Sequence, residues 1–147
     1  MDWLFELQIP RSSHNVLVIG PLGKTFITGV SSVYRADQYD AQILGRNMSE
    51  DEFKTLMKEM NGTLNRYWPC NSCIWFGYLL SPFSLGLSFL IPNMCISDAK
   101  LGLIAAIERQ NRLKLREKGL RLLYKQGFSM SWLELEVVVP CKGEEKT

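Results

Sequence analysis

The sequence predicts an α+β fold: a small antiparallel sheet, made of an N-terminal hairpin and a C-terminal strand, packed with two longer helices and an apolar helical hairpin. Three features predict it: β-branched runs near both ends of the chain, a capped amphipathic helix, and an uncharged segment that leads into a second helix. A chain of 147 residues fits one domain. We expect that domain to cover 16–139, with an N-terminal segment at 1–15 and a C-terminal tail at 140–147.

The N-terminal hairpin is expected from two β-rich runs that a turn separates. The run VLVI at 16–19 is bounded by GPLG at 20–23, which is typical of a strand followed by a turn. The run 25–34 is again rich in β-branched and aromatic residues and would supply the second strand. Polar residues dominate 35–46, which predicts a loop.

A helix is predicted to begin just after Ser49. The Ser49 side chain can accept a hydrogen bond from the amide three residues on, and Glu52 can reach back to the Ser49 amide, which is the capping box. Beyond this start, apolar residues recur at helical spacing and charged residues fall off their stripe. The stripe consists of Phe53, Leu56, Met57, Met60 and Leu64.

The segment 67–97 has no charged residue, and its apolar part, 74–96, is long enough for a transmembrane helix. Glycines, serines and two prolines interrupt it, and Pro82 near its middle would remove a backbone hydrogen bond. A pair of short helices that dips into the membrane and returns therefore fits better than one span. The side chains expected to contact the membrane or a partner are Trp75, Phe76, Leu79, Leu80, Phe83, Leu87, Phe89 and Leu90.

A second long helix is predicted from the N-cap signal Ser97-Asp98 to about Lys125, with Gly127 as its C-terminal cap. Basic residues dominate its later part. They form a predicted basic face of Arg109, Arg112, Arg116, Lys118 and Arg121. The run WLELEVVV at 132–139 alternates apolar and acidic residues at its start and predicts the closing strand.

Basic residues stand on both sides of the uncharged segment, with Lys54, Lys58 and Arg66 before it. Each basic side chain gains roughly 1 kcal/mol near an anionic bilayer, and positive charge on both flanks favours placing both ends on the cytosolic side. This distribution favours a segment that dips into the membrane or lies on it. An ordinary solvated helix face is the alternative explanation of the same charges.

Cys70 and Cys73 form a Cys-x-x-Cys pair, for which four interpretations compete. A thioredoxin-type redox pair should open a helix after a strand, whereas a helix precedes this one. A closed zinc site needs four ligands, and neither a second such pair nor more than one histidine is present, so we expect no metal. S-acylation suits thiols that stand just before an apolar run, and two acyl chains anchor stably where one does not. Simple burial is the fourth interpretation.

Little in the sequence favours catalysis. A single histidine, His14, leaves no nucleophile triad, and GPLGKT at 20–25 lacks the first glycine of a phosphate-binding loop. The 17 basic and 15 acidic residues nearly balance, which does not favour nucleic acid binding. We therefore expect no enzyme, no cofactor, no small-molecule substrate and no nucleic acid partner. The first residues lack a secretory signal, so we expect no disulfide framework.

The order of these features resembles the family that contains golgin subfamily A member seven, the yeast Ras palmitoyltransferase accessory subunit and the cysteine-rich hydrophobic (CHIC) proteins. Cys70 and Cys73 fall where family members carry palmitoylated cysteines. Glu52-Phe53, ERQNRL at 108–113 and ELEVVV at 134–139 resemble the family's first helix start, Asn-containing stretch and closing strand. The resemblance covers roughly 16–139. The CHIC proteins differ in having a dense cysteine cluster, and the uncharged segment here is longer and richer in Pro and Gly than in golgin subfamily A member seven.

The resemblance implies an accessory-subunit-like domain that supports a polytopic Asp-His-His-Cys-type protein acyltransferase, with the catalytic cysteine in that partner. It also implies Cys70 and Cys73 as palmitate-carrying lipidation sites of a lipoprotein. The expected location is the cytosolic face of the Golgi membrane, or alternatively the plasma membrane, with a role in Golgi-to-surface protein transport.

Three other functions stay open. The chain could be an integral membrane protein with one spanning segment at 74–96, which would place Lys54 and Asp98 on opposite sides of the bilayer. It could be a thiol–disulfide redox protein that uses both cysteines of the Cys-x-x-Cys pair. It could also be a soluble structural adaptor in which the apolar segment is buried as a helix pair.

Overall fold

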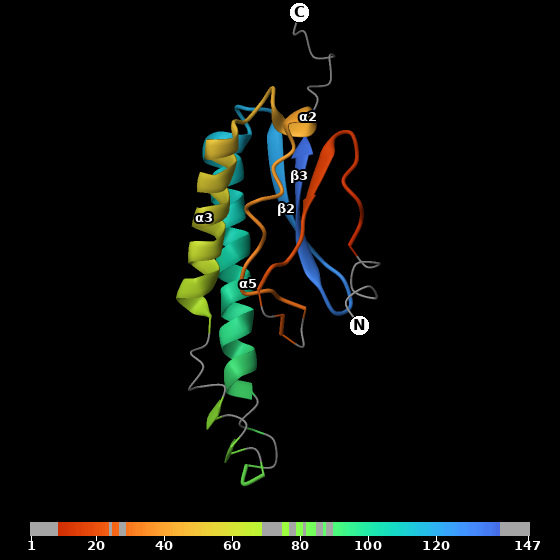
Figure 1. Ribbon diagram of the computed structural model, residues 1–147. Coiled ribbons are helices and arrows are strands. Elements are labelled where there is room, and N and C mark those ends of the chain that lie inside the picture. The colour runs from red at the N-terminus through yellow and green to blue at the C-terminus, as the bar shows by residue number, and fades with distance from the viewer. Residues whose placement is uncertain are drawn as a thin grey trace, which may run out of the picture.

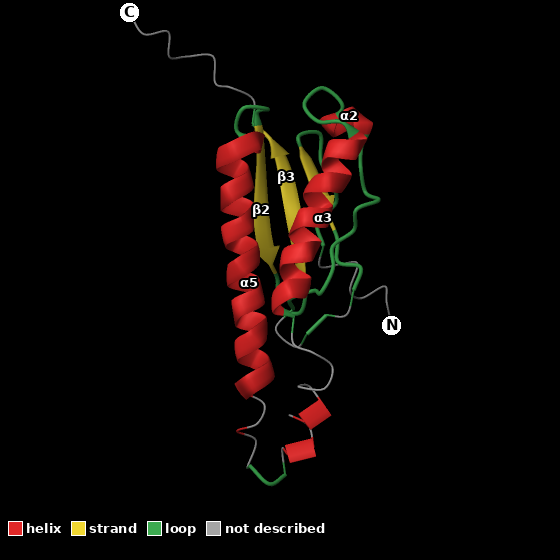
Figure 2. Cartoon of the chain, turned by 90° about the vertical axis from the view of Figure 1, so that its left-hand side faces the viewer, coloured by secondary structure: helices red, strands yellow, loops and turns green. Residues whose placement is uncertain are grey.

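The computed structural model describes residues 9–23, 25–26, 29–68, 75–76, 79–80, 82–84, 87 and 90–138. The elements in chain order are β1 (Val16–Ile19), α2 (Ala41–Leu44), α3 (Glu50–Tyr67), α5 (Leu90–Gln110), the π-helix η2 (Asn111–Leu115), β2 (Leu120–Gln126) and β3 (Ser131–Val137). The fold is α+β, as predicted. Helices α3 and α5 lie side by side over one face of a three-stranded antiparallel sheet (Figure 1, Figure 2).

The sheet has the strand order β1-β3-β2, so that the C-terminal strand is central. Leu135 pairs with Leu17 of β1 on one side and with Leu122 of β2 on the other. Since side chains alternate between the two faces of a strand, one face of the sheet is lined by leucine and isoleucine. These inward residues are all nearly inaccessible: Leu17, Ile19, Leu120, Leu122, Leu133 and Leu135.

Helix α3 begins as the sequence predicts. The backbone N–H of Glu52 donates to Ser49 Oγ over 3.4 Å, and the N–H of Ser49 donates to Glu52 Oε2 over 3.1 Å. The five predicted stripe residues of α3 are all buried against the sheet and against α5. Helix α5 meets them with smaller or equally apolar side chains, namely Ala99, Leu103, Ala106 and Ile107.

The predicted N-terminal hairpin is wrong in its second strand. Strand β1 pairs with β3, and the run 25–34 contains isolated bridges, Thr25 with Ser31 and Pro21 with Tyr34. The backbone N–H and C=O of Tyr34 bond the side-chain amide of Asn61 on α3, each over 2.9 Å. These backbone groups are therefore satisfied by a helix rather than by a strand ladder.

The predicted loop at 35–46 contains the short helix α2. Asp40 caps it, since its carboxylate accepts from the backbone N–H of Gln42 over 2.8 Å. The helix places Leu44 in the core with no exposed surface. One turn is too short for a periodic apolar pattern to appear in the sequence.

Helix α5 begins earlier than predicted, at Leu90 rather than after Ser97. Pro92 falls in its first turn, where the missing N–H costs no helical hydrogen bond. Ile96 is 1% exposed, so its burial stabilises the helical turns before Ser97. A helix that began after a cap at Ser97 would not contain these turns. The stretch 90–96 is thus the start of this long helix and not an arm of a separate apolar hairpin.

The predicted end of this helix at Lys125 is also wrong, because the chain from Leu120 to Gln126 is strand β2. Gly119 turns the chain with a φ of 64°, a conformation that glycine adopts without strain. Within β2, buried Leu120 and Leu122 flank exposed Arg121, which is the period of a strand. Gly127 is no helix cap, and its N–H donates to the Met130 carbonyl across the β2–β3 turn.

Candidate functional site

The apolar tip is the part of the uncharged segment that the structure describes between α3 and α5. It lies beyond the end of α3 and the start of α5, at the opposite end of the molecule from α2 (Figure 1). Its large side chains are between 51% and 86% exposed. These residues are Trp75, Phe76, Leu79, Leu80, Phe83 and Leu87. Six such side chains at one end form a surface that burial against another body would stabilise.

Several predicted site residues fall outside this description. Cys70, Cys73 and Phe89 are not among the described residues, and Leu90 is described only as the first residue of α5. Trp75–Phe76 and Leu79–Leu80 are helical. Among the described residues, no helix is both long enough and apolar enough to cross a membrane.

The predicted basic residues do not share one helix face. Arg109 on α5 bonds Glu59 Oε1 of α3 over 2.7 Å. Lys118, in the turn before β2, bonds Glu52 Oε1 over 2.5 Å. These two cations therefore tie the C-terminal half of the chain to α3. The bond from Lys118 is the main cause that lowers the pKa of Glu52 below its ordinary value.

The remaining three arginines line a basic cleft of about 850 Å³ at the end of the molecule opposite the tip. It lies where η2, the start of β2, the end of β3 and the turn after α2 meet. Its basic side chains are Arg46, Arg112, Arg116, Lys118 and Arg121, and Glu117 is the one carboxylate among the described residues that line it. Val137 and Val138 supply apolar surface, beside the buried Leu120.

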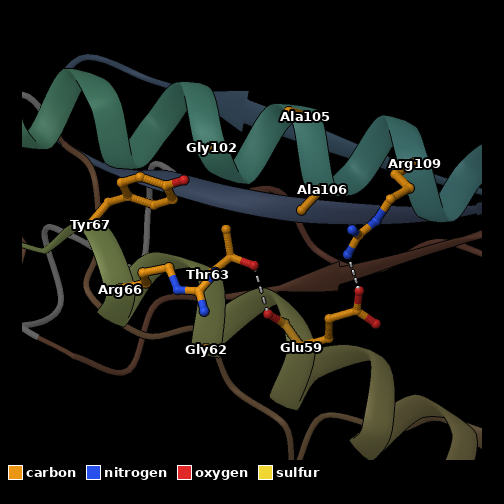
Figure 3. Close-up of a pocket in the computed structure, with 9 residues that line it drawn as sticks. All are labelled: Glu59, Gly62, Thr63, Arg66, Tyr67, Gly102, Ala105, Ala106 and Arg109. Carbon is orange, nitrogen blue, oxygen red and sulfur yellow. Dashed lines mark hydrogen bonds and ion pairs between the residues drawn. The ribbon is translucent and has the colours of Figure 1, made fainter.

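A second hollow, of about 470 Å³, runs along the seam between α3 and α5 (Figure 3). Small residues form most of its lining: Gly62, Thr63, Gly102, Ala105 and Ala106. A Cβ atom added at Gly102 would come within 3.0 Å of the Tyr67 ring, so glycine lets the two helices approach closely here.

Glu59 is the one carboxylate among the described residues that line this seam, and both of its oxygens accept hydrogen bonds. Glu59 Oε1 accepts from Arg109 and Glu59 Oε2 accepts from Gln110, each over 2.7 Å. The Thr63 hydroxyl donates to the Glu59 backbone carbonyl over 3.0 Å and is not poised as a nucleophile. The groups in this seam therefore hold the two helices together, and they show no arrangement of a base with a nucleophile.

No family model, no curated protein and no solved structure matches this chain. Within the described ranges, no three His, Cys, Asp or Glu side chains lie close enough together to hold a metal ion. The tip and the cleft are therefore the features of the molecule that bear on its function.

The sequence missed the residues that shape the cleft. The Asn111 side chain donates to the Leu122 carbonyl and accepts from the Leu122 N–H, each over 2.8 Å, at the open edge of β2. Asn47 Nδ2 donates to the Lys118 carbonyl over 2.7 Å. Arg46 joins the cleft from a turn about seventy positions before the other arginines. No local signal indicates these bonds, because Asn111 bonds a residue 11 positions away and Asn47 bonds one 71 positions away.

Proposed function

We propose that this chain is a non-catalytic accessory subunit or adaptor on the cytosolic face of an endomembrane, the Golgi or alternatively the plasma membrane. In this role it supports a polytopic protein S-acyltransferase, Golgi-to-surface protein transport, or both. The observation that carries the proposal is the apolar tip, whose six large side chains are each more than half exposed. The resemblance of the chain to acyltransferase accessory subunits supplies the class of partner.

The tip has the composition of a segment that enters the membrane interface. Trp75, Phe76 and Phe83 are aromatic, and aromatic residues are favoured at the boundary between headgroups and acyl chains. Each large apolar side chain that leaves water gains roughly 1.5–3 kcal/mol. The same surface would pack equally well on the transmembrane helices of a partner, where small and apolar contacts replace lipid.

The lipidation sites we propose, Cys70 and Cys73, precede the tip by a few positions. An acyl chain on either thiol would enter the same side of the bilayer as the tip. A single acyl chain binds only marginally, and a second signal makes anchoring stable. Two thiols together with the tip would provide that second signal.

The first experiment measures acylation in cells by hydroxylamine-sensitive acyl exchange, together with the partition of the protein between membrane and cytosol. The variants are Cys70→Ser, Cys73→Ser and the double substitution. We expect the double variant to lose the acyl signal and most of its membrane fraction. If the protein without substitutions shows no acyl signal but still partitions to membranes, the tip alone anchors it.

The tip is tested with a matched pair of triple variants. Leu79, Phe83 and Leu87 are replaced by serine in one, and Leu22, Leu113 and Phe128 in the other, which are exposed side chains of the same types elsewhere. We expect only the tip variant to lose membrane partition. Equal partition of both variants, with no acylation in either, would leave a soluble adaptor as the better description.

A further inference from the structure

The basic cleft gathers four arginine side chains in one hollow. Across the described ranges, no ion pair involves the four arginines of the cleft, which are Arg46, Arg112, Arg116 and Arg121. In contrast, Arg109, outside the cleft, and Lys118, in its lining, are both bonded to α3. Unpaired guanidinium groups that line one hollow attract a ligand with carboxylates or phosphates.

The floor of the cleft is apolar, which restricts the chemical class of ligand that the cleft would bind. Val137 and Val138 present apolar surface, and Val138 is 47% exposed, whereas Leu120 beside them is buried in the core. No aromatic side chain occurs among the described residues of the lining, and aromatic side chains are the usual platform on which proteins stack single-stranded bases. A peptide segment that carries both acidic and aliphatic side chains complements the arginines and the floor together.

The walls of the cleft are held before any ligand arrives. The Asn111 amide fixes η2 to the edge of β2 through both backbone groups of Leu122. The Asn47 amide fixes the turn after α2 to the carbonyl of Lys118. Since a site that needs no reordering binds more tightly, these bonds favour recognition by a defined surface over loose charge attraction.

The cleft also stands far from the apolar tip. Helix α5 has 21 residues, which is about 30 Å along its axis. The tip lies beyond the start of this helix, and η2 and the start of β2 form the cleft beyond its end. Figure 1 shows the two ends of α5 toward opposite ends of the molecule. The attraction of lipid charge is screened over about 8 Å at physiological ionic strength. If the tip enters the bilayer, as the proposed function states, the cleft faces the cytosol and not the lipid that holds the tip.

We propose that the basic cleft binds an acidic and aliphatic peptide segment of a protein partner on the cytosolic side. The arginines would pair with carboxylates of the segment, and one of its aliphatic side chains would rest on Val137 and Val138. This inference deepens the proposed function and depends on it for the orientation of the cleft, but the binding itself requires no membrane.

The test measures binding of a fluorescein-labelled peptide of repeated Glu-Glu-Leu by fluorescence anisotropy in solution. Peptides of repeated Glu-Glu-Ser and Lys-Lys-Leu test the apolar floor and the charge. The variant Arg112→Glu/Arg116→Glu is compared with Lys54→Glu/Lys58→Glu, which changes the net charge equally on the exposed face of α3. We expect the cleft variant to bind the Glu-Glu-Leu peptide about 100-fold more weakly and the α3 variant to bind it almost normally.

A second variant, Arg46→Gln/Arg121→Gln, removes charge without reversal and keeps the test valid if the first variant unfolds. Equal weakening by the cleft and α3 variants would overturn the proposal, because binding would then follow net charge alone. Anionic vesicles or an oligonucleotide that displaces the peptide through the same arginines would also overturn it in favour of phosphate recognition. Since no membrane is present, peptide binding and tip-dependent partition can fail separately.

Discussion

At the scale of single residues, a buried polar contact joins β3 to the loop before α2. Ser131 Oγ donates to the Gly29 carbonyl over 2.8 Å and lies 2.6 Å from the Tyr34 hydroxyl oxygen. A hydroxyl carries one proton, and Ser131 gives its proton to Gly29, so Tyr34 must donate to Ser131. The Ser131 and Tyr34 side chains that form these bonds have no exposed surface.

Ser131→Ala should destabilise the protein more than Tyr34→Phe. The alanine leaves both the Tyr34 hydroxyl and the Gly29 carbonyl without this partner, at about 1–3 kcal/mol for each buried group. The phenylalanine removes one hydrogen bond and leaves the bond to Gly29 intact, at about 1 kcal/mol. Urea unfolding curves measure both changes, and equal losses would contradict the donor assignment.

Tyr34 also predicts how stability changes at alkaline pH. Burial raises the pKa of the Tyr34 hydroxyl above its ordinary value of 10.0. The unfolded chain then releases this proton at a pH where the native protein retains it, so the free energy of unfolding falls as the pH rises above about 10. Burial raises the pKa of Tyr124 as well. Tyr34→Phe should therefore flatten the alkaline loss of stability without abolishing it.

Two asparagines form backbone contacts that could not be predicted from the sequence. Asn61 bonds both backbone groups of Tyr34, and Asn111 bonds both backbone groups of Leu122. Each side-chain amide replaces one peptide group of a neighbouring strand. Nothing in the sequence near Asn61 indicates a partner 27 positions away, because the contact exists only once the sheet and α3 have packed.

At the scale of elements, the start of α3 is linked to the turn before β2 through one carboxylate. Glu52 closes the capping box with the Ser49 amide and also accepts from Lys118. The hydrogen bond from Lys118 is the first cause that lowers the pKa of Glu52 below 4.5. The stabilisation it gives is present above the unfolded pKa and is lost as the pH falls through the folded pKa.

Glu52→Gln should make thermal stability less dependent on pH in the acid range below about pH 4.5. Glutamine can still close the capping box, so the helix start is kept while the charge is removed. Lys118→Met should flatten the same slope, and the double variant should flatten it no further. Additive effects in melting curves recorded across this pH range would contradict a shared ion pair.

Local signals explain which elements the sequence could predict. The capping box and the stripe of α3 lie within a few turns, and both are confirmed. Strand β2 was missed because Leu120, Arg121, Leu122 and Lys125 are good helix formers and continue a helical pattern. The alternation of buried and exposed residues makes this segment a strand only because its leucines pack beside those of β3. This tertiary contact overrides the local helix propensity.

At the scale of the whole molecule, the sequence predicted two functional surfaces as sets of residues but not their separation. It placed the apolar segment and the basic residues next to each other along the chain. In the structure, a helix of 21 residues separates them. Two of the basic residues form ion pairs with α3. Arg46 then completes the cleft from an unrelated part of the chain, which no linear pattern could indicate.

This separation predicts how the molecule stands on a bilayer. In a protein whose Trp3, Trp68 and Trp132 are replaced by phenylalanine, Trp75 reports the tip. Adding Trp75→Phe and Val138→Trp to that protein places its only tryptophan in the lining of the cleft. Each protein is purified from cell membranes and reconstituted with lipids that carry bromine on their acyl chains. Because bromine quenches only tryptophan that it contacts, we expect strong quenching of Trp75 and none for the Val138→Trp probe, about 30 Å away along α5. Quenching at both positions would mean that α5 lies along the membrane, and the cleft would then face lipid instead of a cytosolic partner.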